Sequence, residues 1–313
     1  MPTPSATSPE PYVDPPGPLA PSATFHFKSG DGRGLYGEWF LPAAPRAVAL
    51  IVHGYLEHCG RYREVAHVLA QAGIASFTYD MRGHGRADGQ RSYIERYEEY
   101  LDDLDAALGE LERLTSELAV DSPLPRALIG HSNGGLITLR ALSDPARRPD
   151  TFDVAVLSSP FLGFKVKISA FKDTIGRLAG RWFPTLSLPS ELQLEHLTSD
   201  PQKQRERQLD TLCSDVASAG WFVAVQEAHR YVLEHAGAIR LPTLWVVGGD
   251  DHIADPEAAA RVSARLGQPA EYHDLAGFQH EVFNERERGR VFGLLCEFLT
   301  KQLALDAPRA DVG

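Results

Sequence analysis

The chain has few cysteines, no surplus of basic residues and no long apolar run, and each shortage argues against a class of protein. Among 313 residues there are three cysteines, Cys59, Cys213 and Cys296, which are odd in number and widely spaced. Neither a disulfide framework nor a metal-binding spacing follows, and a cytoplasmic, reducing compartment is expected. The formal net charge of −11 argues against a nucleic-acid-binding protein, because phosphate binding requires a basic stripe. The apolar runs at 47–53 and 154–159 are far too short to span a membrane.

The beginning of the chain lacks the features of a signal peptide. Residues 1–22 are rich in Pro, Ser, Ala and Thr and contain neither a basic segment nor an apolar core. Since such a segment can bury little apolar surface, we expect a disordered or loosely packed tail. The whole chain is 43% hydrophobic, and the remainder is long enough to bury a large core.

From residue 24 onward, strand patterns alternate with helix patterns, and no internal repeat is present. Apolar and alternating runs predict strands at 24–28, 35–41, 47–53, 74–80, 126–130, 154–159, 242–248 and 271–275. The first two form a hairpin around the glycine-rich residues 30–34. Helical spacing predicts helices at 62–72, 97–118, from 134 onward and near 286–303. The alternation predicts an α/β protein with a mostly parallel central sheet and helices on both faces.

One interval, between Ser159 and Leu241, breaks this alternation. It contains helix-like pieces and turns rich in Pro and Leu, but no convincing strand. An insertion at this point would lie over the carboxyl ends of the strands, where open parallel sheets have their active sites. We therefore predict a core formed by residues 23–160 and 240–305, with a helical cap formed by residues 161–239.

The segment Gly130-His131-Ser132-Asn133-Gly134 has the G-x-S-x-G pattern of a nucleophile elbow. A short apolar run precedes it and a helix-like segment follows at once, which is the strand–turn–helix context the elbow requires. The glycines suit a turn so sharp that a Cβ would collide with neighbouring backbone. The pentapeptide alone is a weak signal, so the prediction of Ser132 as a nucleophile depends on its context.

A serine nucleophile needs a base and an acid that orients this base. Behind a G-x-S-x-G elbow the order along the chain is serine, acid, histidine, and three histidines follow the strand that ends at residue 248. His273 lies within the last predicted strand, and His252 adjoins the candidate acids and can hardly turn back to the serine. His280 lies in the loop after the last strand and is the predicted base.

The candidate acids lie in the segment Gly248-Gly-Asp-Asp-His-Ile-Ala-Asp255. Asp255 precedes Pro256 and Glu257, which is the usual composition of a helix start, so we interpret it as a helix cap. Asp250 and Asp251 both lie at the end of the strand, and spacing alone does not separate them.

Several motifs in order carry a family resemblance. They are the elbow around Ser132, His53-Gly-Tyr-Leu-Glu-His58, Gly60-Arg-Tyr62, Asp80-Met-Arg-Gly-His-Gly85 and Gly89. Together they resemble the monoacylglycerol lipase/lysophospholipase group of the α/β-hydrolases, whose close relatives include serine aminopeptidase-like enzymes. The resemblance extends from about Thr24 to Leu303 and weakens through the predicted cap.

This resemblance implies an α/β-hydrolase fold and a Ser-His-Asp triad. The family's acid is the fourth residue of a G-x-x-D turn. This resemblance favours Asp251 as the acid and leaves Asp250 as the alternative. The His-Glu pair of the family matches His280 and Glu281.

The predicted oxyanion hole consists of two backbone N–H groups, those of Asn133 and, by the same resemblance, Tyr55. The family usually has methionine at the position of Asn133, which leaves the backbone donor intact and makes the substrate preference less certain. His53, Glu57 and His58 have side chains that can bind metals, but the resemblance explains them as parts of the oxyanion loop. We expect neither a metal nor a cofactor.

The predicted function is that of a serine carboxylester hydrolase acting on monoacylglycerols or related lipid esters. Two alternatives remain, a serine-dependent aminopeptidase or amidase and a non-catalytic binding protein with the same fold. An aminopeptidase would need an acidic anchor, for which Glu191, Glu195 and Glu227 are candidates that cannot be assigned. Acyl transfer, acyl-chain length, headgroup and oligomeric state are not determined by the sequence.

The early cap segment, residues 160–184, combines apolar and basic side chains. The apolar ones on one face are Ile168, Phe171, Ile175, Leu178 and Trp182, and the basic ones are Lys165, Lys167, Lys172, Arg177 and Arg181. This pattern fits either a helix packed on the core with a solvated basic face or a transient contact with a lipid surface. Trp221 and Phe222, later in the cap, are expected mainly to pack, with pocket lining as the alternative.

Overall fold

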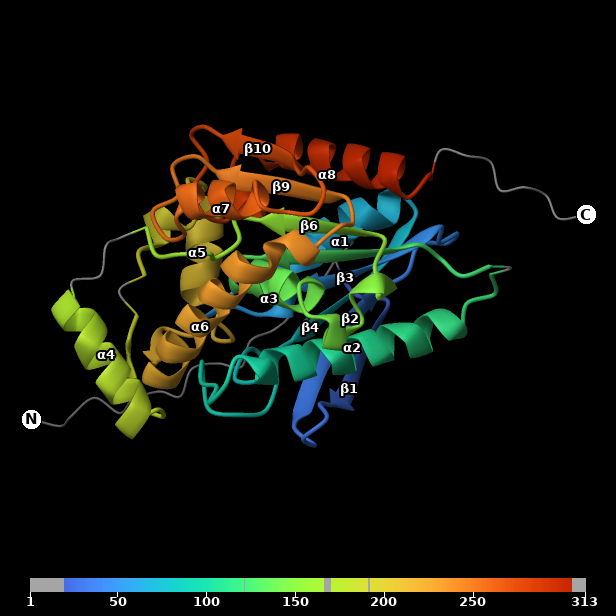
Figure 1. The fold of residues 1–313 in the computed structure, drawn as a ribbon. Coiled ribbons are helices and arrows are strands. Elements are labelled where there is room, and N and C mark those ends of the chain that lie inside the picture. The colour runs from blue at the N-terminus through green and yellow to red at the C-terminus, as the bar shows by residue number, and fades with distance from the viewer. Residues whose placement is uncertain (1–19, 121, 166–169, 191, 306–313) are drawn as a thin grey trace, which may run out of the picture.

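The computed structural model describes residues 20–120, 122–165, 170–190 and 192–305. Its centre is an eight-stranded sheet with the strand order β1-β2-β4-β3-β5-β6-β9-β10 (Figure 1). The strands are β1 (Ala23–Lys28), β2 (Gly34–Phe40), β3 (Ala47–Val52), β4 (Ile74–Asp80), β5 (Arg126–His131), β6 (Val154–Ser158), β9 (Thr243–Gly248) and β10 (Glu271–Leu275). β2 pairs antiparallel with β1 and β4, whereas the strands from β4 to β10 are parallel. The predicted hairpin and the mostly parallel sheet are confirmed.

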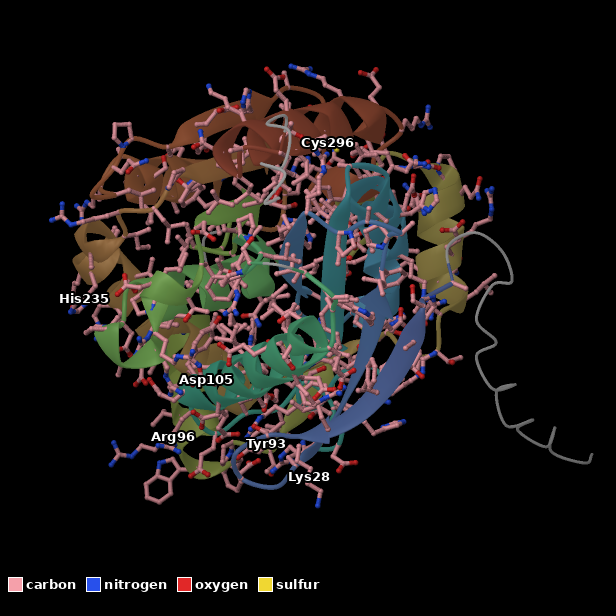
Figure 2. All side chains as sticks on the ribbon, turned by 90° about the vertical axis from the view of Figure 1, so that its right-hand side faces the viewer. Lys28, Tyr93, Arg96, Asp105, His235 and Cys296 are labelled. Atoms are coloured by element: carbon pink, nitrogen blue, oxygen red, sulfur yellow. The ribbon has the colours of Figure 1, made fainter. Side chains whose placement is uncertain are left out.

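Helices cover both faces of this sheet, which explains why its central strands are continuous apolar runs. Alternate residues of β3 point to opposite faces, so Val48, Leu50 and Val52 join one core, and Ala47, Ala49 and Ile51 join the other. The first core is closed by α2 (Glu98–Ser116), α3 (Asn133–Leu142), α6 (Ala219–His235) and α7 (Pro256–Ser263). The second is closed by α1 (Arg63–Gln71) and α8 (Arg288–Gln302). Figure 2 shows the two layers from the side, with Asp105 marking α2 and Cys296 marking α8.

Between β6 and β9 lies a long segment, residues 159–242, which we call the insertion. It contains α4 (Ala170–Trp182), β7 (Ser187–Pro189), α5 (Pro201–Leu209), β8 (Val216–Ser218) and α6. The expectation that this interval has no strand is wrong, because β7 and β8 pair antiparallel. Each has only three residues, too few to show a period of two. α4 packs on α6 at the outer end of the molecule (Figure 1).

Short 3-10 helices complete the described chain. They are η1 (Cys59–Tyr62), η2 (Pro145–Arg147), η3 (Pro149–Thr151), η4 (Leu194–His196), η5 (Ala236–Ala238) and η6 (Val282–Asn284).

The first strand begins at Ala23, and hydrogen bonds to β2 reach one residue further back. Ser22, expected in the tail, donates its N–H to the carbonyl of Trp39 at 2.7 Å and accepts from the N–H of Leu41 at 3.0 Å. Pairing with β2 therefore extends to Ser22, and residues 1–19 of the expected tail lie outside the described residues.

Candidate active site

Ser132 occupies a sharp turn between β5 and α3. Its φ of 51° and ψ of −118° are a strained combination for a residue with a side chain. The turn is too tight for a Cβ at either flanking glycine of the motif. A Cβ at Gly130 would lie 2.4 Å from the carbonyl oxygen of Gly134, and one at Gly134 would lie 2.1 Å from that of Val52. The sequence pattern at 130–134 therefore has a steric cause in the fold.

Ser132, His280 and Asp251 lie together at the carboxyl ends of β5, β10 and β9. Nε2 of His280 is 2.8 Å from Oγ of Ser132, and Nδ1 is 2.6 Å from Oδ2 of Asp251. All three residues are buried. The other carboxylate oxygen of Asp251 accepts from the N–H groups of Ile253 at 2.7 Å and Ala254 at 2.9 Å. The acid is thus held in one orientation toward the imidazole.

The electrostatic environment of His280 suits a general base. Burial lowers the pKa of its ring, but the charge of Asp251 and its hydrogen bond outweigh this, so the pKa is raised from the ordinary value of 6.5. With Nδ1–H donated to Asp251, the neutral ring presents Nε2 as the acceptor for the hydroxyl proton of Ser132. The arrangement can therefore remove a proton from Ser132 and stabilise the imidazolium that results.

The other candidates from the sequence lie elsewhere. Asp250 is exposed, and Asp255 caps α7 by accepting from the N–H of Glu257 at 3.1 Å. His273 lies on the edge strand β10, with Nε2 3.1 Å from Glu271. His252 does not reach the serine, yet it lines the cavity beside it, and its ring packs on that of His196 at 4.6 Å. The sequence did not predict that His252 lines the cavity, because it shows only that this residue adjoins the candidate acids.

The loop after β3 carries Tyr55, and its shape is set by Glu57. Oε1 of Glu57 accepts from the N–H of Gly54 and from the hydroxyl of Tyr62, both at 2.6 Å. Oε2 accepts from Nε of Arg61 at 2.9 Å, and Arg61 also pairs with Glu281. Burial opposes the charge of Glu281, but Arg61 outweighs it and lowers the pKa of that carboxyl. Residues 53–62 thus form a loop beside the serine that is held internally by hydrogen bonds and ion pairs.

The two N–H groups expected to form an oxyanion hole have no acceptor within the described part of the chain. Among the described residues, neither the N–H of Tyr55 nor that of Asn133 donates a hydrogen bond. The side chain of Asn133 turns into the core, where Oδ1 accepts from the hydroxyl of Tyr97 at 3.1 Å. Its Nδ2 lies 3.9 Å from Sδ of Met81. The asparagine therefore leaves its backbone donor available and keeps its amide out of the cavity.

A cavity of about 400 Å³ opens onto Ser132 and His280. Its wall is largely apolar and comes from both the core and the insertion. The lining residues include Leu56, Phe161, Phe164, Leu192, Trp221 and Ile253. Trp221 thus lines the cavity, as the alternative interpretation had it, while Phe222 packs beside Phe164 with ring centroids 5.8 Å apart.

Within the described part of the chain, one cluster has the side chains for a metal site: His58, Asp210 and Cys213, whose ligand atoms lie within 4.8 Å of one another. Both ring nitrogens of His58 already form hydrogen bonds, because Nδ1 accepts from the N–H of Gly60 and Nε2 lies 2.7 Å from Asp210. Burial raises the pKa of the Cys213 thiol to about 12, which keeps it protonated. We interpret the group as a hydrogen-bonded pair with a neighbouring thiol. Both ring nitrogens of His53 are also hydrogen-bonded, Nδ1 to the carbonyl of Gly54 and Nε2 to the N–H of Met81.

Comparison with known proteins relates this chain to lipid-cleaving enzymes. The family described as serine aminopeptidase, S33, matches residues 43–287. A monoacylglycerol lipase from Mycolicibacterium smegmatis is 29% identical over 278 residues, covering 88% of this chain and 95% of the lipase. A phospholipase from Bacillus subtilis is 27% identical over 250 residues, covering 79% and 93%. The crystal structure of Paleococcus ferrophilus monoacylglycerol lipase superposes with a TM-score of 0.76 at 28% identity, covering 86% of this chain and 99% of that one.

Proposed function

The chain belongs to the serine aminopeptidase, S33 family of α/β-hydrolases and is a serine ester hydrolase, and from this we propose that it cleaves monoacylglycerols or related lipid esters at Ser132. The observation that carries the proposal is the hydrogen-bonded triad of Ser132, His280 and Asp251, with distances of 2.8 and 2.6 Å. Ser132 and His280 line an apolar cavity. An acyl chain in this cavity would present its ester to the serine.

The mechanism follows from the geometry of the side chains. His280 accepts the hydroxyl proton as Ser132 attacks the ester carbonyl, and the N–H groups of Tyr55 and Asn133 hold the oxyanion. His280 then gives the proton to the departing alcohol, which leaves an acyl-enzyme. Water, deprotonated by His280, attacks the carbonyl of this ester. The acyl–Oγ bond then breaks, His280 returns the proton to Oγ of Ser132, and the fatty acid is released. Asp251 holds the imidazole in the required tautomer throughout.

The lining of the cavity favours esters over peptides with a free amino terminus. An aminopeptidase needs a carboxylate to bind the substrate amine, but no Asp or Glu is among the described residues that line this cavity. Glu195 is exposed, and Glu227 lines a separate hollow beneath α6. Glu191 lies outside the described residues. The site therefore shares the serine chemistry of the family, but its cavity lacks the carboxylate that an aminopeptidase needs to bind its substrate.

The test is hydrolysis of a chain-length series of monoacylglycerols, with short p-nitrophenyl esters and aminoacyl amides alongside. Ser132→Ala should lower kcat by about 10⁶-fold, since the nucleophile and base act as a unit. Turnover of medium or long acyl chains by the wild type would support the lipid assignment. Turnover of short activated esters alone would remove that assignment, and no Ser132-dependent turnover would favour a non-catalytic binding protein.

A contact between the insertion and a lipid surface is part of this proposal. Four large apolar side chains between the last residue of α4 and β7 are exposed; we call them the exposed edge. They are Trp182, Phe183, Leu186 and Leu188, with exposed fractions of 69%, 66%, 43% and 58%. Lys165 and Arg181 are exposed nearby in the sequence, Lys167 lies outside the described residues, and the side chains of Lys172 and Arg177 are not described. Apolar side chains beside basic ones suit the interfacial layer of a membrane. None of the described helices has the length and apolarity to cross a membrane, and the cytoplasmic location remains a prediction.

A further inference from the structure

The side chain of Tyr55 leaves the loop after β3 and contacts the insertion. Its ring stacks on that of Trp221, with centroids 3.8 Å apart and planes 8° apart. Its hydroxyl donates to the carbonyl of Ser92 at 2.5 Å and accepts from the N–H of Ser218 at 3.3 Å. Ser218 is the N-cap of α6, and its own hydroxyl donates to the same carbonyl of Ser92 at 2.7 Å. The phenol thus occupies a junction between the start of α6 and the core.

Two further contacts join the same loop to the insertion. The carbonyl of Leu56 accepts from the N–H of Ser214 at 3.0 Å and from the guanidinium of Arg207 at 3.2 Å. His58 lies 2.7 Å from Asp210. Residues of the insertion therefore bind the loop at three of four successive positions.

The loop requires external support, because Leu56 has a φ of 67°. The left-handed region costs a residue with a side chain about 1–2 kcal/mol. Other conformations of the loop would move the N–H of Tyr55, which immediately precedes Leu56. The contacts with the insertion oppose such a change.

We propose that the side chain of Tyr55 is a positioning group, through which the start of α6 sets the place of the Tyr55 N–H. This inference depends on the proposed function, in which that N–H stabilises the oxyanion. Such a donor works at 2.7–3.1 Å from the oxyanion, and a misplacement of about 1 Å costs on the order of 10²-fold in rate. Because the oxyanion forms only in the transition state, misplacement lowers kcat and leaves substrate binding nearly unchanged.

Tyr55→Phe isolates the contribution of the hydroxyl, since it keeps the ring, the stack and the backbone N–H. We expect kcat on the best monoacylglycerol to fall about 5- to 20-fold, with KM changed less than about twofold. The affinity for a long-chain trifluoromethyl ketone, which forms a tetrahedral adduct with Ser132, should fall by the same factor as kcat/KM. The pH profile should not move, because His280 and Asp251 are untouched.

A second pair of variants tests the stack. Trp221→Ala should lower kcat further than Tyr55→Phe, and Trp221→Phe should recover most of the loss by restoring a ring. Tyr272→Phe is the matched control, because it removes a hydroxyl that donates to the carbonyl of Pro256, outside the site. It should retain the wild-type kcat, and thermal unfolding of each variant checks that the fold is intact.

Two results would overturn the inference. One is an unchanged kcat in folded Tyr55→Phe and Trp221→Ala, and the other is a loss expressed only in KM. If the wild type itself showed no Ser132-dependent turnover, the proposed function would fail and this inference with it.

Discussion

At the scale of single residues, the acid beside His280 offers the sharpest test of the triad. Asp251 is 2.6 Å from Nδ1 of His280, whereas its neighbour Asp250 is exposed. Asp251→Asn should lower kcat by about 10⁴-fold, because an amide no longer favours the tautomer with a proton on Nδ1. Asp250→Asn removes the same charge one residue away and should remain close to the wild type. Equal losses in the two variants, measured on one ester, would argue against this assignment.

The same pair predicts how activity depends on pH. His280 acts as a base only when neutral, and its pKa is raised above the ordinary 6.5 by Asp251 in spite of burial. The acid limb of kcat/KM should therefore have its midpoint above 6.5 in the wild type and in Asp250→Asn. In Asp251→Asn the largest of the charges that raise this pKa is gone, so the midpoint of the residual activity should move to lower pH. A midpoint that does not move would mean that the limb reports another group.

At the scale of elements, the elbow glycines can be compared with a glycine that has room. A Cβ at Gly134 would lie 2.1 Å from the Val52 carbonyl, but one at Gly109, exposed on α2, would meet nothing within 4 Å. Gly134→Ala should lower the free energy of unfolding by about 3 kcal/mol or more. Gly109→Ala should raise it by about 0.5–1 kcal/mol, because alanine is the better helix former. Urea unfolding measures both, and a neutral Gly134→Ala would contradict the close approach of α3 to β3.

The elements also show what the sequence could and could not predict. β3 and β4 were predictable because strands buried on both faces leave continuous apolar runs. β7 and β8 were not, since three residues carry no period and the pair depends on contacts between distant parts of the insertion. The same limit applies to the site. The chain order selects Ser132 and His280, but nothing in the spacing separates Asp250 from Asp251 or reveals that Tyr55 stacks on Trp221.

The exposed edge predicts binding to lipid vesicles. Trp182→Ser combined with Leu188→Ser should weaken vesicle binding at least about tenfold, because a large apolar side chain contributes about 1.5–3 kcal/mol when fully buried. Turnover of a short soluble ester should not change. Leu41→Ser is the control, as this residue is 40% exposed and follows β2 at the opposite end of the sheet. Equal weakening by the control would mean that the binding is not specific to the edge.

A further set of changes separates charge from apolar burial. Gln would replace the five basic residues Lys165, Lys167, Lys172, Arg177 and Arg181. Binding to anionic vesicles should fall and lose its dependence on salt. If these vesicles were bound as before and dispersed lipid were hydrolysed as before, the basic residues would have no part in the contact.

At the scale of the whole molecule, buried histidines should dominate stability in mild acid. Burial is the main cause that lowers the pKa of four of them, to about 4 for His53 and His229 and about 3 for His84 and His131. In the unfolded chain each takes up a proton near pH 6.5. Between these values the unfolded state binds more protons than the folded state, so stability falls as the pH falls. His280 has the opposite shift, and its contribution is lost only as the pH rises through its raised value.

The expected loss is large enough to measure. Each such histidine contributes up to about 1.4 kcal/mol per pH unit between about pH 6.5 and 4, so urea unfolding at pH 7.5, 6.5 and 5.5 should give a steepening decline. His84→Leu tests a single contribution, because Nε2 of His84 is buried without a partner among the described residues. In this variant unfolding should take up about one proton fewer, so the free energy of unfolding should fall less steeply with falling pH. His26→Leu, at an exposed position on β1, should leave the slope unchanged. A decline that begins only below about pH 4, beneath the range in which unfolded histidines take up protons, would show instead that the histidines are charged in the folded protein.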